Sequence, residues 1–152
     1  NLPTLYKNQT YKTIIIYSAA IVESLLHYKL KSLIESGRVR ESKIFKKEFK
    51  YDELSKVILN DELGVDLPIV LCKKADIEKH LKDNTQFHDM IIAGKRCRLL
   101  TPTLFKYCNE IKDLRNNIHM ASMMEVDDKY TKVKVNNIYR KVKKVIDRIE
   151  SY

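Results

Sequence analysis

The segment EIKDLRNNIHMAS, residues 110–122, holds an arginine and a histidine at a spacing that could do chemistry. Read as a helix at about 100° per residue, it sets Arg115 within the apolar side. His119 follows one turn later at the edge of that side, and Asn116 borders the pair on the polar side. A guanidinium keeps its charge, so an arginine that faces inward requires an anionic partner. The pattern therefore indicates either an internal ion pair or an anion-binding site.

The residue types suit cleavage of RNA. An arginine fork held on a rigid helix can bind a phosphate through two hydrogen bonds, and a histidine beside it can move protons near neutral pH. Together they fit attack of a ribose 2′-hydroxyl on the adjacent phosphate, which needs no metal ion. We expect Arg115 to stabilise the charged transition state, His119 to act as general acid/base and Asn116 to orient the phosphate or the histidine. The structural alternative is that Arg115 pairs with Glu23 or another carboxylate.

The motif LRNNIH, followed by a loop and one more helix, resembles the HEPN superfamily of helical domains, as does the earlier stretch YSAAIVESLLHYKL. The resemblance implies a metal-independent endoribonuclease of a toxin–antitoxin, abortive-infection or antiviral defence system. It implies a composite active site at a homodimer interface, without cofactor or metal, in which Arg115, Asn116 and His119 are catalytic and Glu23 supports Arg115. RNA, a second copy and an antitoxin or effector protein are the implied partners. The alternative is a non-catalytic HEPN-like module that dimerises or binds RNA or a partner. Only three residues separate Arg115 from His119, which is fewer than the family usually has, and this short spacing favours the non-catalytic module.

Basic residues outnumber acidic ones by 29 to 20, which gives a formal charge of +9. Such a surplus favours polyanionic partners, although it also serves solubility. The last predicted helix carries much of it. The candidate RNA-binding residues form two groups along the chain, which are Lys95, Arg96 and Arg98, and Arg140, Lys141 and Lys144. The alternative for the basic face of the last helix is that it is simply solvated.

Other features narrow the class of protein. Three glycines exclude a glycine-rich phosphate-binding loop, and three cysteines without CxxC spacing indicate reduced thiols in the cytoplasm rather than a zinc site. The longest apolar run, residues 14–22, is shorter than a membrane span requires, so no membrane-spanning segment is expected. The first residue is not methionine, and we expect the chain to be a single HEPN-like domain, residues 1–152, taken from a longer protein.

The elements that would position the site are mostly helices. Apolar spacing predicts helices over about residues 7–36, 52–63, 86–98 and 102–123 and from residue 131 to the end, the third interrupted near Gly94. Gly37 suits the position after the first helix, and Thr101 and Thr131 (or Asp128) suit N-caps. Residues 69–83 are ambiguous between strand and helix. The predicted fold is an all-α, up-and-down bundle of four to five helices, with a short strand or extended segment around residues 43–49.

Overall fold

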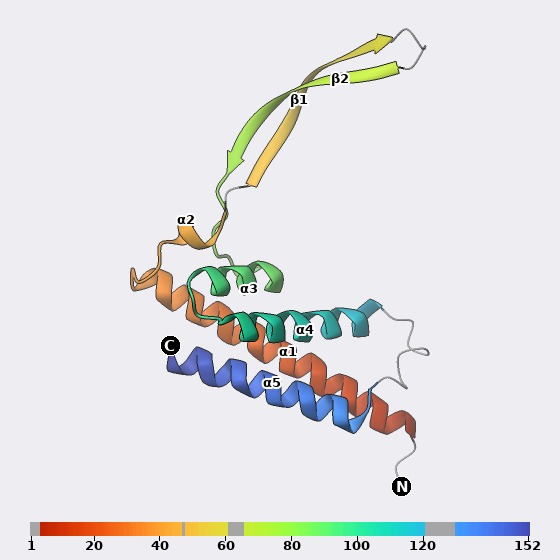
Figure 1. Ribbon diagram of the computed structural model, residues 1–152, viewed down its shortest axis with the longest axis vertical. Helices are drawn as coiled ribbons and strands as arrows, with labels where there is room; N and C mark the ends of the chain where they lie inside the picture. The colour runs from red at the N-terminus through yellow and green to blue at the C-terminus, as the bar shows by residue number, and fades with distance from the viewer. Residues whose placement is uncertain (1–3, 47, 61–65, 121–129) are drawn as a thin grey trace.

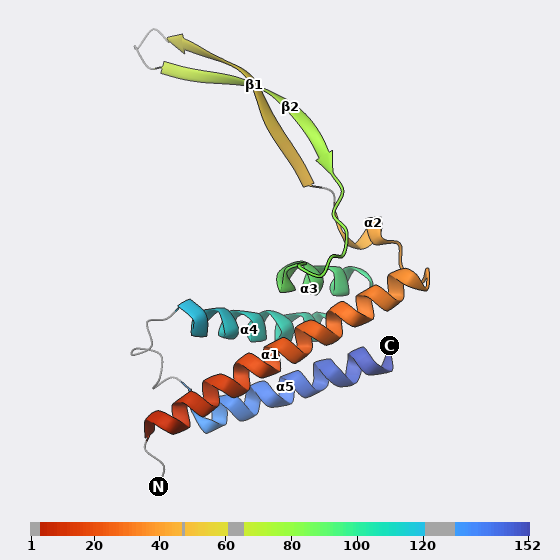
Figure 2. The same ribbon diagram turned by 180° about the vertical axis from the view of Figure 1, so that it is seen from behind.

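The computed structural model describes residues 4–46, 48–60, 66–120 and 130–152, which form a helical body and a projecting two-stranded arm (Figure 1). The elements are α1 (Thr4–Glu35), α2 (Glu41–Ile44), β1 (Glu48–Asn60), β2 (Asp66–Ile77), α3 (Phe87–Arg96), α4 (Pro102–Met120) and α5 (Lys132–Ser151). In the body, α4 runs antiparallel to α1 and α5, and α3 lies on the side from which the arm rises (Figures 1 and 2).

The long helix α1 supplies the centre of the body. Its side chains at helical spacing are buried, and they pack with apolar residues of α3, α4 and α5 in one core cluster. The predicted apolar stripes of the last two helices are confirmed, because Cys108 and Ile111 of α4 and Val142 and Val145 of α5 are buried in the same cluster. A smaller cluster joins Ile15 of α1 to Tyr130 and Val135 near the start of α5.

The all-α prediction is wrong. Residues 52–60 of the helix predicted over residues 52–63 are instead in β1, and residues 61–63 lie outside the described residues. β1 pairs with β2 in an antiparallel hairpin from Glu48↔Ile77 to Asn60↔Asp66. A register shift between Glu53 and Ser55 marks an irregularity in β1. The stretches KVIL and IVLC favour strands because their β-branched side chains fit a pleated sheet. The ambiguous segment 69–83 is strand as far as Ile77. Of the expected extended segment around residues 43–49, residues 43–44 end α2 and residues 48–49 begin β1, whereas residue 47 lies outside the described residues.

The other helix boundaries follow local signals. Thr101 Oγ1 accepts a hydrogen bond from the Leu104 N–H, and Thr131 Oγ1 accepts one from the Lys134 N–H, which confirms both predicted N-caps. Gly37, after α1, has a φ of +70°, a conformation that glycine adopts without steric cost. The predicted interruption at Gly94 is wrong, because α3 continues to Arg96. The predicted end of the fourth helix near residue 123 and the alternative cap Asp128 lie outside the described residues.

Among the described residues, one helical segment, Thr10–Glu35, is long and apolar enough to cross a membrane. Of the most apolar 18-residue stretch within this segment, 33% is buried inside the body. Val22, Leu26 and Leu30 of this segment are fully buried in the core, so packing within the body accounts for part of its apolar character.

The base of the arm is tied to the body through Glu41. One oxygen of this carboxylate, Oε1, accepts a hydrogen bond of 2.6 Å from the Leu81 N–H, and Oε2 lies 2.9 Å from His80 Nδ1. Burial raises the pKa of Glu41, but the hydrogen bonds from His80 and Leu81 outweigh it and hold the pKa below its ordinary value of 4.5. The ionised carboxylate therefore fixes the segment that leads from the arm back to α3.

Glu41→Gln is expected to lower the thermal unfolding midpoint near neutral pH, because the neutral amide makes weaker hydrogen bonds. The loss should be about 1–2 kcal/mol, or about 2–8 °C. Because the pKa of Glu41 is lower in the folded state than in the unfolded state, its ionised carboxylate stabilises the fold at pH values above the unfolded-state pKa. This contribution is lost as the pH falls through the folded-state pKa. Calorimetry should therefore show the difference between variant and wild type at about pH 6 and little of it at about pH 3. A difference that is independent of pH would contradict this role of the charge.

Candidate functional site

The helical wheel predicts Arg115 within the apolar side of α4, whereas the structure leaves its side chain partly exposed. Its Nη1 donates a hydrogen bond to Oε2 of Glu23 on α1, and the two side chains are 28% and 27% exposed. Its guanidinium carbon lies 6.0 Å from the centroid of the Phe87 ring, at the start of α3. The expected contact between Arg115 and Glu23 is therefore present, and Arg115 is only half-buried.

A cleft of about 460 Å³ opens beside this ion pair, between α1, α4 and the loop that leads into α3. Its lining is predominantly polar. The residues that line it are Glu23, Asp83, Asn84, Thr85, Gln86, Phe87, His88, Lys112, Arg115 and Asn116. A purely structural arginine needs no cleft beside it, so the cavity leaves room for a ligand next to the guanidinium.

Lys112 brings a second positive charge to the cleft. It precedes Asn116 by one helical turn, and its side chain is 18% exposed. Its Nζ lies 3.5 Å from Nδ1 of His88, 3.5 Å from Oδ1 of Asn109 and 3.3 Å from Oδ1 of Asp113. Lys112 therefore links α4 to the imidazole of His88 in the first turn of α3.

The sequence interpretation missed Lys112 and His88. Lys112 could have been found, because it lies three residues before Arg115 and four before Asn116, on neighbouring positions of one helix face. His88 carried no such signal, since it reaches the cleft only through the packing of α3 against α4. The start of α3 adds its own positive end, because the first N–H groups of a helix have no acceptor within the helix.

Of the predicted site residues on α4, the structure describes the side chains of Arg115 and Asn116 but not that of His119. Asn116 is exposed and lines the cleft. His119 lies in α4 one turn after Arg115, but its side chain is outside the described part of the chain. The described side chains thus bring together Arg115, Asn116 and Glu23.

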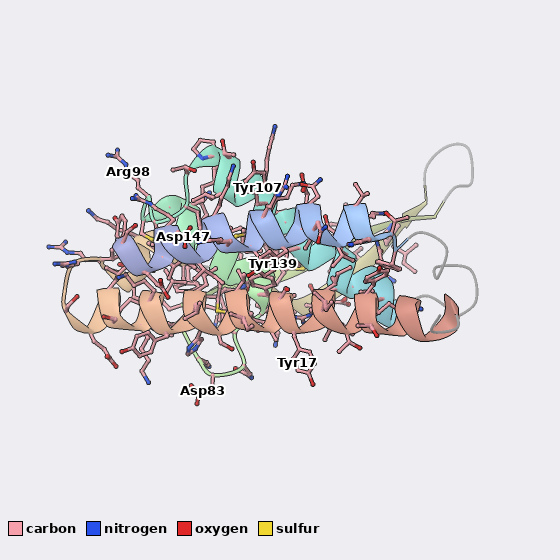
Figure 3. All side chains as sticks on the ribbon, turned by 90° about the horizontal axis from the view of Figure 1, so that it is seen from below. Tyr17, Asp83, Arg98, Tyr107, Tyr139 and Asp147 are labelled. Carbon is pink, nitrogen blue, oxygen red and sulfur yellow. The ribbon has the colours of Figure 1, made fainter. Side chains whose placement is uncertain are left out.

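The predicted RNA-binding residues do not form one surface with the cleft. Arg140, Lys141 and Lys144 line a separate pocket of about 390 Å³ beside Tyr107 of α4. Figure 3 shows Tyr107 and Asp83, which lines the cleft, on opposite sides of the α1–α5 pair.

The other three predicted basic residues surround the end of α3, and all are exposed. Arg96 donates a hydrogen bond of 2.6 Å to the carbonyl of Ile44, and the Lys95 ammonium lies 4.4 Å from the centroid of the Phe105 ring. Arg98 has a φ of 61°, and its carbonyl accepts a hydrogen bond from Arg148. Arg96 therefore holds the end of α2 through this hydrogen bond, in addition to carrying a charge that could bind RNA.

The cysteines do not supply a nucleophile to the cleft. Burial raises the pKa of the Cys108 thiol to about 12, and burial also raises the pKa of Cys97. Cys72 is exposed on the arm. Among the described residues, no group of three His, Cys, Asp or Glu side chains could hold a metal ion.

Comparison of the chain with protein-family models, with curated proteins and with solved structures finds no match.

Proposed function

We propose that this chain is a cytoplasmic endoribonuclease domain of HEPN type that cleaves RNA without a metal ion. The observation that carries the proposal is the polar cleft in which Arg115, Lys112 and Asn116 lie beside His88. Arg115, Lys112 and the start of α3 place positive charge where a phosphate diester could bind, beside the carboxylates of Glu23 and Asp83 in the same lining. The further expectation, that two copies complete the site for a defence or toxin–antitoxin system, rests on the resemblance of the LRNNIH motif.

The chemistry that these residues suit is transfer within the RNA itself. The ribose 2′-oxygen forms a bond to the adjacent phosphorus while the bond from phosphorus to the 5′-oxygen breaks. A histidine removes the proton from the 2′-hydroxyl, and an acid returns a proton to the departing 5′-oxygen. The products are a 2′,3′-cyclic phosphate and a 5′-hydroxyl. His119 is the expected proton carrier, and the position of His88 in the cleft lining makes it the second histidine to test.

The contact with Glu23 is compatible with phosphate binding. A guanidinium has five N–H donors in a fixed fork, and the bond to Glu23 is made by Nη1. Arg115 can therefore hold the carboxylate on one side and a phosphate oxygen on the other. In this arrangement Glu23 positions the fork, and Arg115 stabilises the charge that develops on the phosphate.

A second candidate function is a non-catalytic module that binds RNA or a partner protein. The projecting arm, with its exposed apolar side chains, is the observation that favours it. In this function the cleft binds phosphate without cleaving the chain.

The test is incubation of a single-stranded RNA of mixed sequence with the protein in EDTA. The wild type should give cyclic phosphate and 5′-hydroxyl ends. His119→Ala or His88→Ala should cut the rate by about 10²–10⁴-fold, whichever residue carries the proton. Lys106→Ala, at an exposed position of α4 outside the cleft lining, is the matched control and should retain full activity. RNA binding by a folded wild type without any cleavage would refute the nuclease and favour the module.

A further inference from the structure

The outer half of the arm exposes apolar side chains. Six of them are between 41% and 61% exposed: Leu54, Val57, Ile58, Ile69, Val70 and Leu71. An isolated two-stranded hairpin is marginally stable in water and needs a further layer against its apolar side. Contiguous exposed apolar surface of this kind marks an interaction site. The arm is therefore a surface that requires a covering partner.

The partner covers a face of the arm rather than extending its edge. β2 contains Pro68, which has no N–H to donate, and β1 is irregular between Glu53 and Ser55. Both features disfavour addition of another strand. Paired residues point to the same side of a sheet, so Val57 and Ile69 share one face with Leu71, the partner of Ser55. That face presents three apolar side chains without an intervening charge.

Charge indicates what the partner is. Residues 48–77 contain four lysines and seven acidic residues, which gives the arm a net charge of −3. The rest of the chain, with 25 basic and 13 acidic residues, has a net charge of +12. Two arms therefore repel each other, whereas an arm and a helical body attract. A second copy of this chain offers the complementary surface.

The helical body has an apolar groove that suits this face. It measures about 450 Å³, lies between α1 and α5, and is lined by Thr10, Thr13, Ile14, Tyr17, Ser18, Ile21 and Tyr139. Ile14, Tyr17, Ile21 and Tyr139 are all exposed large side chains. On the same side of α5, Lys132 lies two turns before Tyr139 and Lys143 one turn after it, although Lys143 also pairs with Asp147.

The arm and the groove of one molecule lie on opposite sides of the body. The arm rises from the side of α2 and α3, whereas α1 and α5 form the far side (Figures 1 and 2). Tyr17 and Tyr139 belong to these two helices, which run side by side (Figure 3). We infer that the arm of one copy docks through its Val57–Ile69–Leu71 face onto the α1–α5 groove of a second copy. This inference goes beyond the proposed function and holds whether or not the cleft cleaves RNA.

The test is sedimentation of the whole chain at up to roughly 100 µM, with one variant on each surface. Ile69→Lys on the arm and Ile21→Glu in the groove both replace exposed side chains, and each should raise the Kd of the dimer at least about tenfold. Tyr28→Glu, also exposed on α1 but outside the groove lining, is the control and should dimerise normally. Circular dichroism checks that all three variants are folded.

Mixing the two variants gives the decisive result. The normal arm of the Ile21→Glu chain meets the normal groove of the Ile69→Lys chain, which leaves the altered groove and the altered arm at the two free ends. The mixture should therefore dimerise more tightly than either variant alone, and added salt should weaken the dimer. A monomeric wild type over the whole concentration range would overturn the inference. Dimerisation of the groove variant alone with the Kd of the wild type would also overturn it and would indicate contact between two arms.

Discussion

Replacement of Arg115 by alanine is expected to slow RNA cleavage by about 10²–10³-fold, the usual cost of removing one donor that stabilises transition-state charge. Arg115 lines the cleft beside Lys112, and its guanidinium is held by Glu23 across the α1–α4 contact. Arg115→Lys should recover little of the rate, because an ammonium cannot bind a phosphate through a planar fork while it also holds Glu23. Turnover and KM should be measured separately with a defined RNA oligonucleotide.

Variants of Glu23 and Lys112 help to separate the possible roles of Arg115. Glu23→Gln keeps an acceptor for the guanidinium but removes the charge, so it should reduce turnover less than Arg115→Ala does. Lys112→Ala removes a cation that attracts the RNA backbone, so it should raise KM more than it lowers turnover, and its effect should shrink at high salt. If Arg115→Ala left the rate unchanged in a folded protein, Arg115 would be only one half of a structural ion pair.

The parts of this fold that follow from local pattern were predictable from the sequence. α1, α4 and α5 are long, carry apolar residues at helical spacing, and in α4 and α5 begin at the threonines that cap them. Such signals depend on residues within a few positions of one another, so one chain suffices to detect them.

The arm could not be recognised in the same way. Residues 54–59, LSKVIL, fit an amphipathic helix as well as a strand when they are read alone. The choice is made by pairing with residues 66–77, which forms a ladder that neither segment can form alone. A short apolar run of this kind therefore specifies a strand only together with the partner strand that stabilises it.

The candidate site also combines contacts that local sequence predicts with contacts that arise only from tertiary packing. The contact between Arg115 and Glu23 was expected because a charged group on an inward helix face requires a partner. His88 reaches the cleft because the loop after the arm places the start of α3 there, and no sequence spacing encodes that position. The tie between Glu41 and the segment at Leu81 also joins residues forty positions apart, and it became evident only in three dimensions.

Truncation of the core at Leu26 should strongly reduce stability. Leu26 is fully buried on α1 and lies against Gly94 of α3, where a Cβ on Gly94 would come within 3.3 Å of it. Leu26→Ala removes this contact and leaves a cavity between helices that cannot close fully, at a cost of roughly 3 kcal/mol. The thermal midpoint should fall by about 6–12 °C.

The matched control is Leu54→Ala on the arm, which removes the same atoms from a side chain that is 61% exposed. It should change the free energy of unfolding of the body by less than about 0.5 kcal/mol, because little buried contact is lost. Urea titrations at low protein concentration, below the association range, compare the two variants directly. Equal losses would mean that the arm and the body unfold as one cooperative unit within a single chain. A large loss at Leu26 alone would mean that Leu54 contributes little to the folding of a single chain, so that the exposed leucine remains free to serve association.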